Sequence, residues 1–218
     1  MTDNTVFWNV DTQYDFIDPN GKLPVGEDQE GARDIEDELR EVTHLAREND
    51  ITVVNTADWH NKNTEELSEE PDFRETFPPH CMADSRGAEY IEATRPENPL
   101  HLDWNEELDR EELAAHDGDL VVYKDAFDVF AGSPESPHAD DVIESLDPER
   151  AVVYGVATDV CVDYAVEGLL DRDIEVYVVE DAVKGIDPEY SSESLDSWRQ
   201  DGARIGSLDE LQDYLEEV

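Results

Sequence analysis

Short runs of apolar, mostly β-branched residues alternate with helical patterns along most of the 218-residue chain. The runs hold few polar positions, which is typical of strands that are covered on both faces in a parallel sheet. The pattern predicts strands at 5–10, 51–57, 119–124, 150–156, 174–181 and 203–207, and helices at about 32–49, 138–146, 159–172, 190–202 and 208–217.

This alternation favours an α/β fold with a mostly parallel sheet and helices on both faces, in one domain over 1–218. The segment at about 58–118 is too polar and Pro-rich for a layer of the sheet. Long irregular inserts tend to be functional. Since ligands of such sheets bind at the carboxyl ends of the strands, the residues at those ends are the first candidates for a site.

The charge restricts the partners that the protein can have. The chain has 59 acidic and 15 basic residues, a formal net charge of −44, spread over all its segments. Such a surface repels nucleic acid and anionic membranes, and its even spread predicts adaptation to high salt, as in halophiles. No apolar run has the length of a membrane span and the N-terminus lacks the pattern of a signal peptide. With two cysteines, we expect a cytoplasmic protein without a disulfide framework.

Three chemically distinct residues close predicted strands. Asp11 follows the first strand, where desolvation would raise its pKa and suit a general base, unless it only caps a turn. Lys124, one of four lysines, would favour a neighbouring thiolate, unless its ammonium only reaches solvent. Cys161 would lie at a helix N-terminus capped by Thr158 or Asp159, which lowers a thiol pKa, although inert buried cysteines are common. Together they predict a thiol-dependent hydrolase with nucleophile, base and cation in one cleft.

A second set of residues has the composition of a metal site. Asp58 and His60 project to the same side of an extended segment, and His80 follows two prolines. One carboxylate and two imidazoles suit zinc, iron or manganese with positions left open for water or substrate. The Asp-x-His pattern alone is weak evidence for a metal site, and the presence of His80 after two prolines strengthens it.

These motifs resemble the isochorismatase-like cysteine hydrolases over nearly the whole chain. Asp11 in NVDTQYDF, Lys124 in VVYKDAFDVF and Cys161 in GVATDVCV are similar to the Asp–Lys–Cys triad of that family. ADWH and FPPHC look like the metal site of its nicotinamidase branch, with Asp58 and His60 in the first and His80 in the second.

The resemblance implies a Rossmann-like, three-layer α/β/α fold with about six parallel strands, in which 58–118 is a metal-site and lid insert. It implies amide hydrolysis through a thioester on Cys161, most directly nicotinamide to nicotinate and ammonia in NAD salvage. It also implies a zinc ion, with iron or manganese as alternatives, that binds the pyridine nitrogen.

The resemblance further implies a cis peptide at Val156–Ala157 and an oxyanion hole from the N–H groups of Ala157 and Cys161. Phe16 and Phe77 would flank the substrate ring, unless they are ordinary core residues. The branch often has a fourth metal ligand, a His, Ser or Glu. Here the candidates are Glu65, Glu66, Ser68 and Glu69.

Alternatives to a nicotinamidase stay open. The same fold could act on another small amide, a carbamoyl compound or a vinyl ether, and a non-catalytic redox sensor would use Cys161 differently. We expect Cys81 to be a packing thiol, and the expected surface histidines are His44, His101, His116 and His138. The expected partner is a small-molecule amide, and the sequence leaves self-association into a homo-oligomer open.

Overall fold

A computed structural model describes residues 4–26, 30–104, 106–130 and 138–216, which form one α/β unit around a single parallel sheet. The strand order is β3-β4-β2-β1-β5-β6-β7. The strands are β1 (Thr5–Val10), β2 (Val53–Asp58), β3 (Leu100–Leu102), β4 (Leu120–Lys124), β5 (Arg150–Val156), β6 (Glu175–Lys184) and β7 (Arg204–Gly206). The predicted fold class is confirmed.

The sheet has seven strands in the described residues, so the expected number of six is wrong. The extra strand, β3, lies inside the insert that we expected to stay outside the sheet, and it pairs with β4. It spans only three residues, and His101 at its centre is exposed. A strand this short at a sheet edge carries no apolar run, so the hydrophobic pattern could not reveal it.

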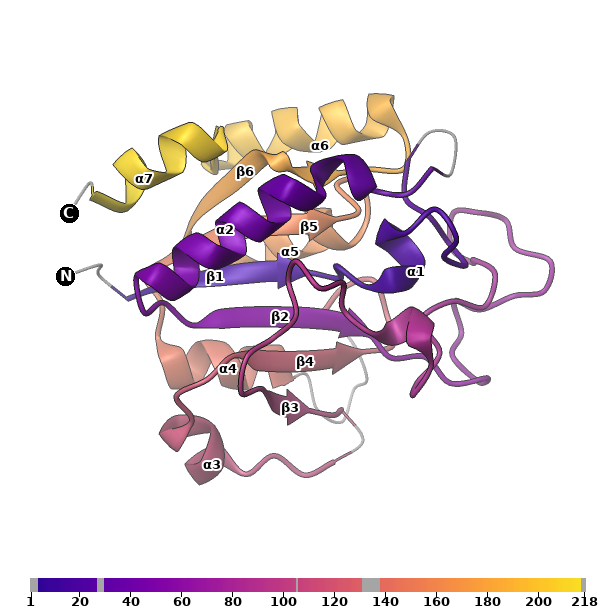
Figure 1. Cartoon of the computed structure of the whole chain (residues 1–218), viewed down its shortest axis with the longest axis horizontal. Coiled ribbons are helices and arrows are strands. Elements are labelled where there is room, and N and C mark those ends of the chain that lie inside the picture. The colour runs from indigo at the N-terminus through magenta and orange to yellow at the C-terminus, as the bar shows by residue number, and fades with distance from the viewer. Residues whose placement is uncertain (1–3, 27–29, 105, 131–137, 217–218) are drawn as a thin grey trace.

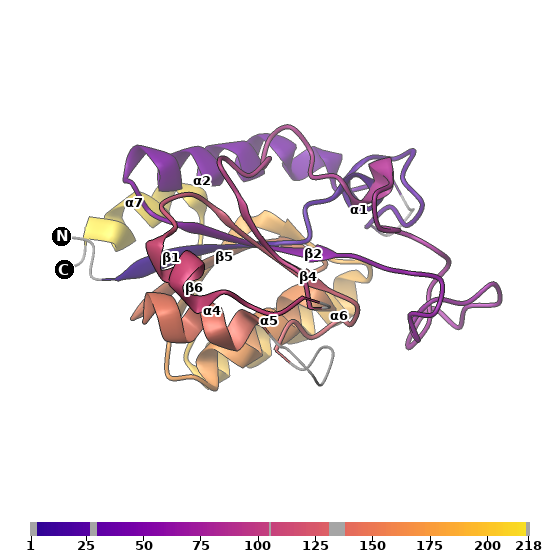
Figure 2. The same cartoon turned by 90° about the horizontal axis from the view of Figure 1, so that it is seen from below.

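The helices form a layer on each side of the sheet. Figures 1 and 2 show α2 (Glu36–Glu48) and α7 (Leu208–Glu216) on one face, and α4 (His138–Leu146), α5 (Cys161–Leu170) and α6 (Pro188–Asp201) on the other. Side chains of β1 alternate between two cores, since Trp8 packs with the second group of helices and Phe7 with the first. This is the three-layer arrangement that the resemblance implies.

The helix boundaries differ from the prediction in small ways. A 3₁₀ turn, η1 (Arg33–Ile35), precedes α2, and α5 is shorter than expected at both ends. Residue 217 of the last predicted helix lies outside the described residues. Three short elements were not predicted: α1 (Tyr14–Ile17), η2 (Arg86–Ala88) and α3 (Arg110–Ala115). Among the described helices, none combines the length and the apolar character that crossing a membrane requires.

The four central strands end at one edge of the sheet. Val10 at the end of β1 pairs with Thr56 of β2 and Gly155 of β5, and Asp58 at the end of β2 pairs with Lys124 of β4. In Figure 1 the strand arrows point toward α1 and the loops of the insert. The residues that directly follow these strands are therefore brought together, as expected for a parallel sheet.

Candidate active site

Lys124 lies at the centre of the residues gathered at this edge. Its Nζ is 2.9 Å from Asp11 Oδ2, donates a hydrogen bond to Asp58 Oδ1 and lies 3.5 Å from Cys161 Sγ. All four side chains are buried. The structure thus brings the three candidate catalytic residues into contact and connects them, through Asp58, to the candidate metal ligands.

The charges in this group shift one another's pKa. Burial raises the pKa of Asp11, and Lys124 only partly offsets this effect. Burial alone would lower the pKa of Lys124, but Asp11 and Asp58 outweigh it and raise this pKa well above its ordinary value. Burial also opposes ionisation of Asp58, yet Lys124 and His60 hold its pKa well below its usual range. The result is a charged Lys124–Asp58 pair beside an Asp11 carboxyl that can hold a proton.

Cys161 is the first residue of α5, but its surroundings differ from the expectation. Neither Thr158 nor Asp159 caps the helix: the N-cap is Val160, which makes no side-chain cap bond. The Asp159 carboxylate instead accepts hydrogen bonds from the backbone N–H groups of Ile186 and Asp187, both at 2.8 Å. Tertiary contacts of Asp159 therefore prevail over local capping.

The thiol pKa also moves in the opposite direction to the expectation. Burial raises the pKa of Cys161 well above its usual value, and the attraction of Lys124 does not reverse this. The resting group is therefore the thiol. An attack by sulfur then requires an acceptor for the proton, and the Asp11 carboxylate is a neighbouring base.

Two buried side chains that the sequence did not single out hold these groups in place. Thr56 Oγ1 donates a 2.6 Å hydrogen bond to Asp11 Oδ1. The Gln13 side chain pairs with the backbone of Asp58 in both directions: its amide donates to the carbonyl at 2.8 Å and its oxygen accepts from the N–H at 2.9 Å. The only signal in the sequence is that both are polar residues within or just after an apolar strand.

The structure brings Asp58, His60 and His80 together and adds Glu66 to them. One ligand atom from each of the four lies within 4.8 Å of the others. His60 Nε2 is 3.0 Å from Glu66 Oε1 and 3.4 Å from Asp58 Oδ2. Of the four candidates for a fourth ligand, Glu66 is therefore the one that the fold places in the group.

This group fits a divalent metal ion. Nε2 of His60 and Oε1 of Glu66 are buried 3.0 Å apart without a well-formed hydrogen bond, and a cation bound by both would satisfy them. His80 Nδ1 lies 2.8 Å from the Pro78 carbonyl, so it can donate there while Nε2, 3.5 Å from Asp58 Oδ2, keeps its lone pair for a metal. Two imidazoles and two carboxylates suit zinc, iron or manganese.

A small apolar cavity of about 80 Å³ opens onto both sets of residues. Cys161 lines it, and so do Asp58 and His80. Phe16 and Phe77 are both in its wall, and their rings contact that of His80 with centroids 5.3 and 6.4 Å away. The cavity can hold a small planar molecule between the thiol and the metal group.

Ala157 and Cys161, the expected oxyanion residues, both line this cavity. The peptide bond Val156–Ala157 is cis, as the resemblance implies. The Ala157 carbonyl accepts a hydrogen bond from the N–H of Val162 at 3.0 Å, which fixes the turn between β5 and α5.

The remaining histidines were expected on the surface, and the structure corrects one of them. His44 and His101 are exposed and His116 is half-buried, but His138 is buried at the start of α4, where its Nε2 bonds to the Asp103 carbonyl at 2.8 Å. Its helical context hid this contact with a distant loop. Cys81 is fully buried, and burial raises its pKa well above the usual value, which fits a packing thiol.

Residues 5–210 match the family model described as an isochorismatase domain. The chain therefore belongs to the isochorismatase family and is a hydrolase of this family. The resemblance found in the sequence motifs is confirmed at this level.

Individual relatives cover nearly the whole chain. It is 27% identical to the nicotinamidase/pyrazinamidase of Mycobacterium tuberculosis over 195 residues, which are 87% of this chain and 91% of that protein. The pyrazinamidase of Pyrococcus horikoshii, solved in complex with zinc, is 25% identical with a TM-score of 0.71 over 94% of this chain and 99% of its own. An isochorismatase family protein of Desulfovibrio vulgaris shares the fold, with a TM-score of 0.76, 20% identity and 99% and 100% of the two chains covered.

Proposed function

We propose that this hydrolase is a metal-containing nicotinamidase, which converts nicotinamide and water to nicotinate and ammonia. One observation carries the proposal. A cavity of about 80 Å³ has Cys161 in its wall, with Lys124 and Asp11 behind the thiol, and also two members of the metal group. Its size and apolar wall suit a small aromatic amide, and two of the three named relatives are a nicotinamidase/pyrazinamidase and a pyrazinamidase.

The first half of the reaction forms a thioester. Asp11, as its carboxylate, takes the proton of the Cys161 thiol while sulfur attacks the carbonyl carbon of the amide. The N–H groups of Ala157 and Cys161 stabilise the negative oxygen of the tetrahedral intermediate. Asp11 then returns its proton to the nitrogen, the C–N bond breaks, and ammonia leaves. Lys124 keeps Asp11 and the sulfur in contact while charge moves between them.

The second half uses water as the nucleophile. Asp11, again a carboxylate, accepts a proton from a water molecule that attacks the thioester carbon. The C–S bond breaks, nicotinate is released, and the sulfur recovers a proton from Asp11. Proton transfer of this kind by a positioned carboxylate is worth about 10²–10⁴ in rate.

Asp58, His60, Glu66 and His80 would hold a divalent ion, zinc in our proposal with iron or manganese as alternatives. When bound, the ion supplies a Lewis acid for the pyridine nitrogen. Phe16 and Phe77 would restrict the ring to one plane, so that the amide carbon faces Cys161. The two roles explain why the metal group and the thiol share one cavity. Nicotinate formed in this way would serve NAD synthesis.

The test compares Cys161→Ala with Cys81→Ala, the other thiol of the chain. Ammonia release from nicotinamide by the zinc-loaded protein should fall at least about 10³-fold in Cys161→Ala, because the described lining of the pocket holds no other thiol and no hydroxyl group. Cys81→Ala should retain turnover. An active Cys161→Ala variant would refute the thioester. If the wild-type protein turns over a carbamoyl compound or a vinyl ether but not nicotinamide, the proposed substrate is wrong.

A further inference from the structure

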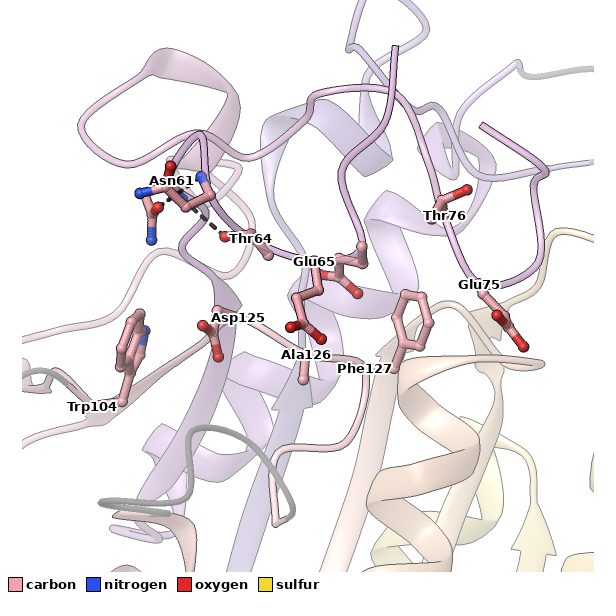
Figure 3. A pocket seen from close by; sticks show the side chains of 11 residues that line it. Asn61, Thr64, Glu65, Glu75, Thr76, Trp104, Asp125, Ala126 and Phe127 are labelled. Carbon is pink, nitrogen blue, oxygen red and sulfur yellow. Dashed lines mark hydrogen bonds between the residues drawn. The ribbon is translucent and has the colours of Figure 1, made fainter. Parts of the chain in front are cut away.

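A second, larger cavity lies beside the substrate pocket. Its volume is about 770 Å³, against about 80 Å³ for the pocket. It is bounded by the loop after β2 and by the segment after β4, and Figure 3 shows several of its carboxylates around the open space. We call it the acidic basin, because Glu65, Glu66, Glu75 and Asp125 line it and its lining, as described, includes no Lys or Arg.

Phe127 is the one residue, among those described as lining the two cavities, that belongs to both. Its ring packs edge-on against Phe77, with centroids 5.8 Å apart and an interplanar angle of 90°. Phe77 lines the pocket, and its neighbour Thr76 lines the basin. The contact between the two rings is therefore the wall between a small apolar space and a large acidic one.

We propose that Phe127 determines substrate size, because its side chain closes the pocket against the basin. With Phe127 in place, only an unextended small molecule reaches Cys161. With a shorter side chain at 127, an ammonium group attached to the substrate could lie among the carboxylates, which attract it by Coulomb forces. The consequences for turnover rest on the proposed amide hydrolysis, but the wall itself rests on geometry.

The wall can be tested without turnover by labelling Cys161. Methyl methanethiosulfonate is small and neutral, and its 2-(trimethylammonium)ethyl analogue is larger and cationic. In both reactions the thiolate attacks the sulfenyl sulfur, methanesulfinate leaves, and a mixed disulfide forms while the thiol proton goes to solvent. Mass spectrometry of digested protein separates Cys161 from Cys81. The rates should be measured at the lowest salt that preserves the circular dichroism, because salt screens the carboxylates.

In Phe127→Ala we expect the cationic reagent to label Cys161 at least about tenfold faster than in wild type, a factor that a pocket contact can supply. The labelling rate of the neutral reagent should increase by a smaller factor. Phe73→Ala is the matched control, because Phe73 lines the pocket but is absent from the described lining of the basin. It should speed both reagents alike. Adding Glu65→Gln and Asp125→Gln to Phe127→Ala should slow only the cationic reagent, by about fivefold, the factor of one cation–carboxylate contact in water.

The proposal that Phe127 forms the wall is wrong if the ratio of the cationic to the neutral labelling rate in Phe127→Ala equals that of wild type. It is also wrong if this ratio equals that of Phe73→Ala. Phe127→Leu provides the same comparison if the alanine variant does not fold.

A substrate series then separates the two proposals. Phe127→Ala should raise kcat/KM for nicotinamides with an aminoalkyl group, relative to nicotinamide itself, by at least about tenfold. If the wild type hydrolyses nicotinamide and neither this ratio nor the labelling changes, the wall is refuted and the nicotinamidase stands. If labelling changes as expected and no amide is hydrolysed, the nicotinamidase is refuted and the wall stands.

Discussion

At the scale of single residues, the site depends on how Lys124 distributes one positive charge. It contacts Asp11, Asp58 and the thiol of Cys161, and all of these groups are buried. Removing one member of a buried ion pair typically costs about 3–5 kcal/mol, because the remaining charge is left uncompensated. The thiol and the metal group are therefore not independent sites: both are stabilised by the same ammonium.

Glu66 gives the sharpest test of the metal group. Glu66→Gln removes the charge of a carboxylate whose Oε1 is buried 3.0 Å from His60 Nε2. We expect the dissociation constant of zinc to rise at least about tenfold, as measured by competition with a chromophoric chelator. Glu69→Gln is the matched control, since Glu69 is exposed in the same loop and should leave the constant unchanged. Equal zinc affinity in Glu66→Gln and wild type would exclude Glu66 as a ligand.

Gly155 explains how β5 approaches the strand that carries Asp11. Its φ is +122°, and a Cβ there would lie 2.1 Å from the backbone oxygen of Val10. Gly155→Ala should therefore lower the free energy of unfolding by more than about 1 kcal/mol, as measured by urea denaturation. Gly202→Ala shares the positive φ, +106°, but its Cβ would meet nothing within 4 Å. Gly202→Ala should therefore lower the free energy of unfolding by less than Gly155→Ala does. Equal losses would show that backbone strain alone, and not the contact with Val10, sets the requirement for glycine.

The sequence predicted some of these residues and not others for a physical reason. Asp11 and Lys124 stand at the ends of apolar strands and Cys161 follows the turn after β5, and parallel pairing brings such ends together whatever the loops do. Glu66 and Phe127 lie in irregular segments, whose path depends on many weak tertiary contacts. Among the acidic residues of the loop after His60, no local pattern distinguishes Glu66. The expected capping of α5 failed for a related cause, because Asp159 contacts a loop that is distant in sequence.

At the scale of elements, the same difference separates strands from loops. The six predicted strands correspond to β1, β2, β4, β5, β6 and β7, because burial on both faces requires continuous apolar runs. The strand β3 and the helix α3 lie in the insert and are short, so neither carries a periodic signal. Both helix layers were predicted from amphipathic spacing, whereas η1 was merged with α2. Regular periodicity in the sequence thus predicted the strands and helices of the sheet and its two layers. The course of the insert that lines the site was visible only in the structure.

The turn at 72–76 illustrates how a loop can be fixed without periodicity. Asp72 accepts hydrogen bonds at 3.0 Å from the backbone N–H groups of Arg74, Glu75 and Thr76. The turn holds Phe73, whose ring packs edge-on against Phe77 in the wall of the pocket. These bonds, led by that of Thr76, lower the pKa of Asp72 to about 2. The carboxylate is therefore charged, and the turn intact, at any neutral assay pH.

Asp72→Ala should release this turn. We expect KM for the proposed substrate, nicotinamide, to rise several-fold with little change in kcat, because Phe73 lines the pocket but has no part in the proposed proton transfers. Steady-state kinetics would measure both constants, with Glu70→Ala, exposed in the same loop, as the control. Because the folded pKa is depressed, the stabilisation is complete above the ordinary Asp pKa and is lost as the pH falls toward about 2. The difference in melting temperature between wild type and Asp72→Ala should vanish there. A lower kcat with unchanged KM would contradict this role.

At the scale of the whole molecule, acidic residues outnumber basic ones both in the interior and on the surface. The buried carboxylates of Asp11 and Asp58 share Lys124, whereas the surface carries most of the 59 acidic residues against 15 basic ones. Surface pairs such as Arg40–Glu36 and Arg110–Glu144 exist, but such exposed pairs contribute little. The net charge of −44 therefore produces repulsion that only mobile ions can reduce.

Stability should consequently rise with salt. Raising KCl from about 0.1 M to 1 M shortens the Debye length from about 10 Å to 3 Å, so most repulsion between surface carboxylates is screened. We expect the melting temperature, followed by circular dichroism, to increase over this range and activity to increase with it. Sucrose stabilises proteins through exclusion without screening charge, so it serves as the control. At low salt, sucrose should restore less stability than KCl does. If the melting temperature stays flat or falls with KCl, self-repulsion is not what limits this fold, and the acidic surface must have another physical basis.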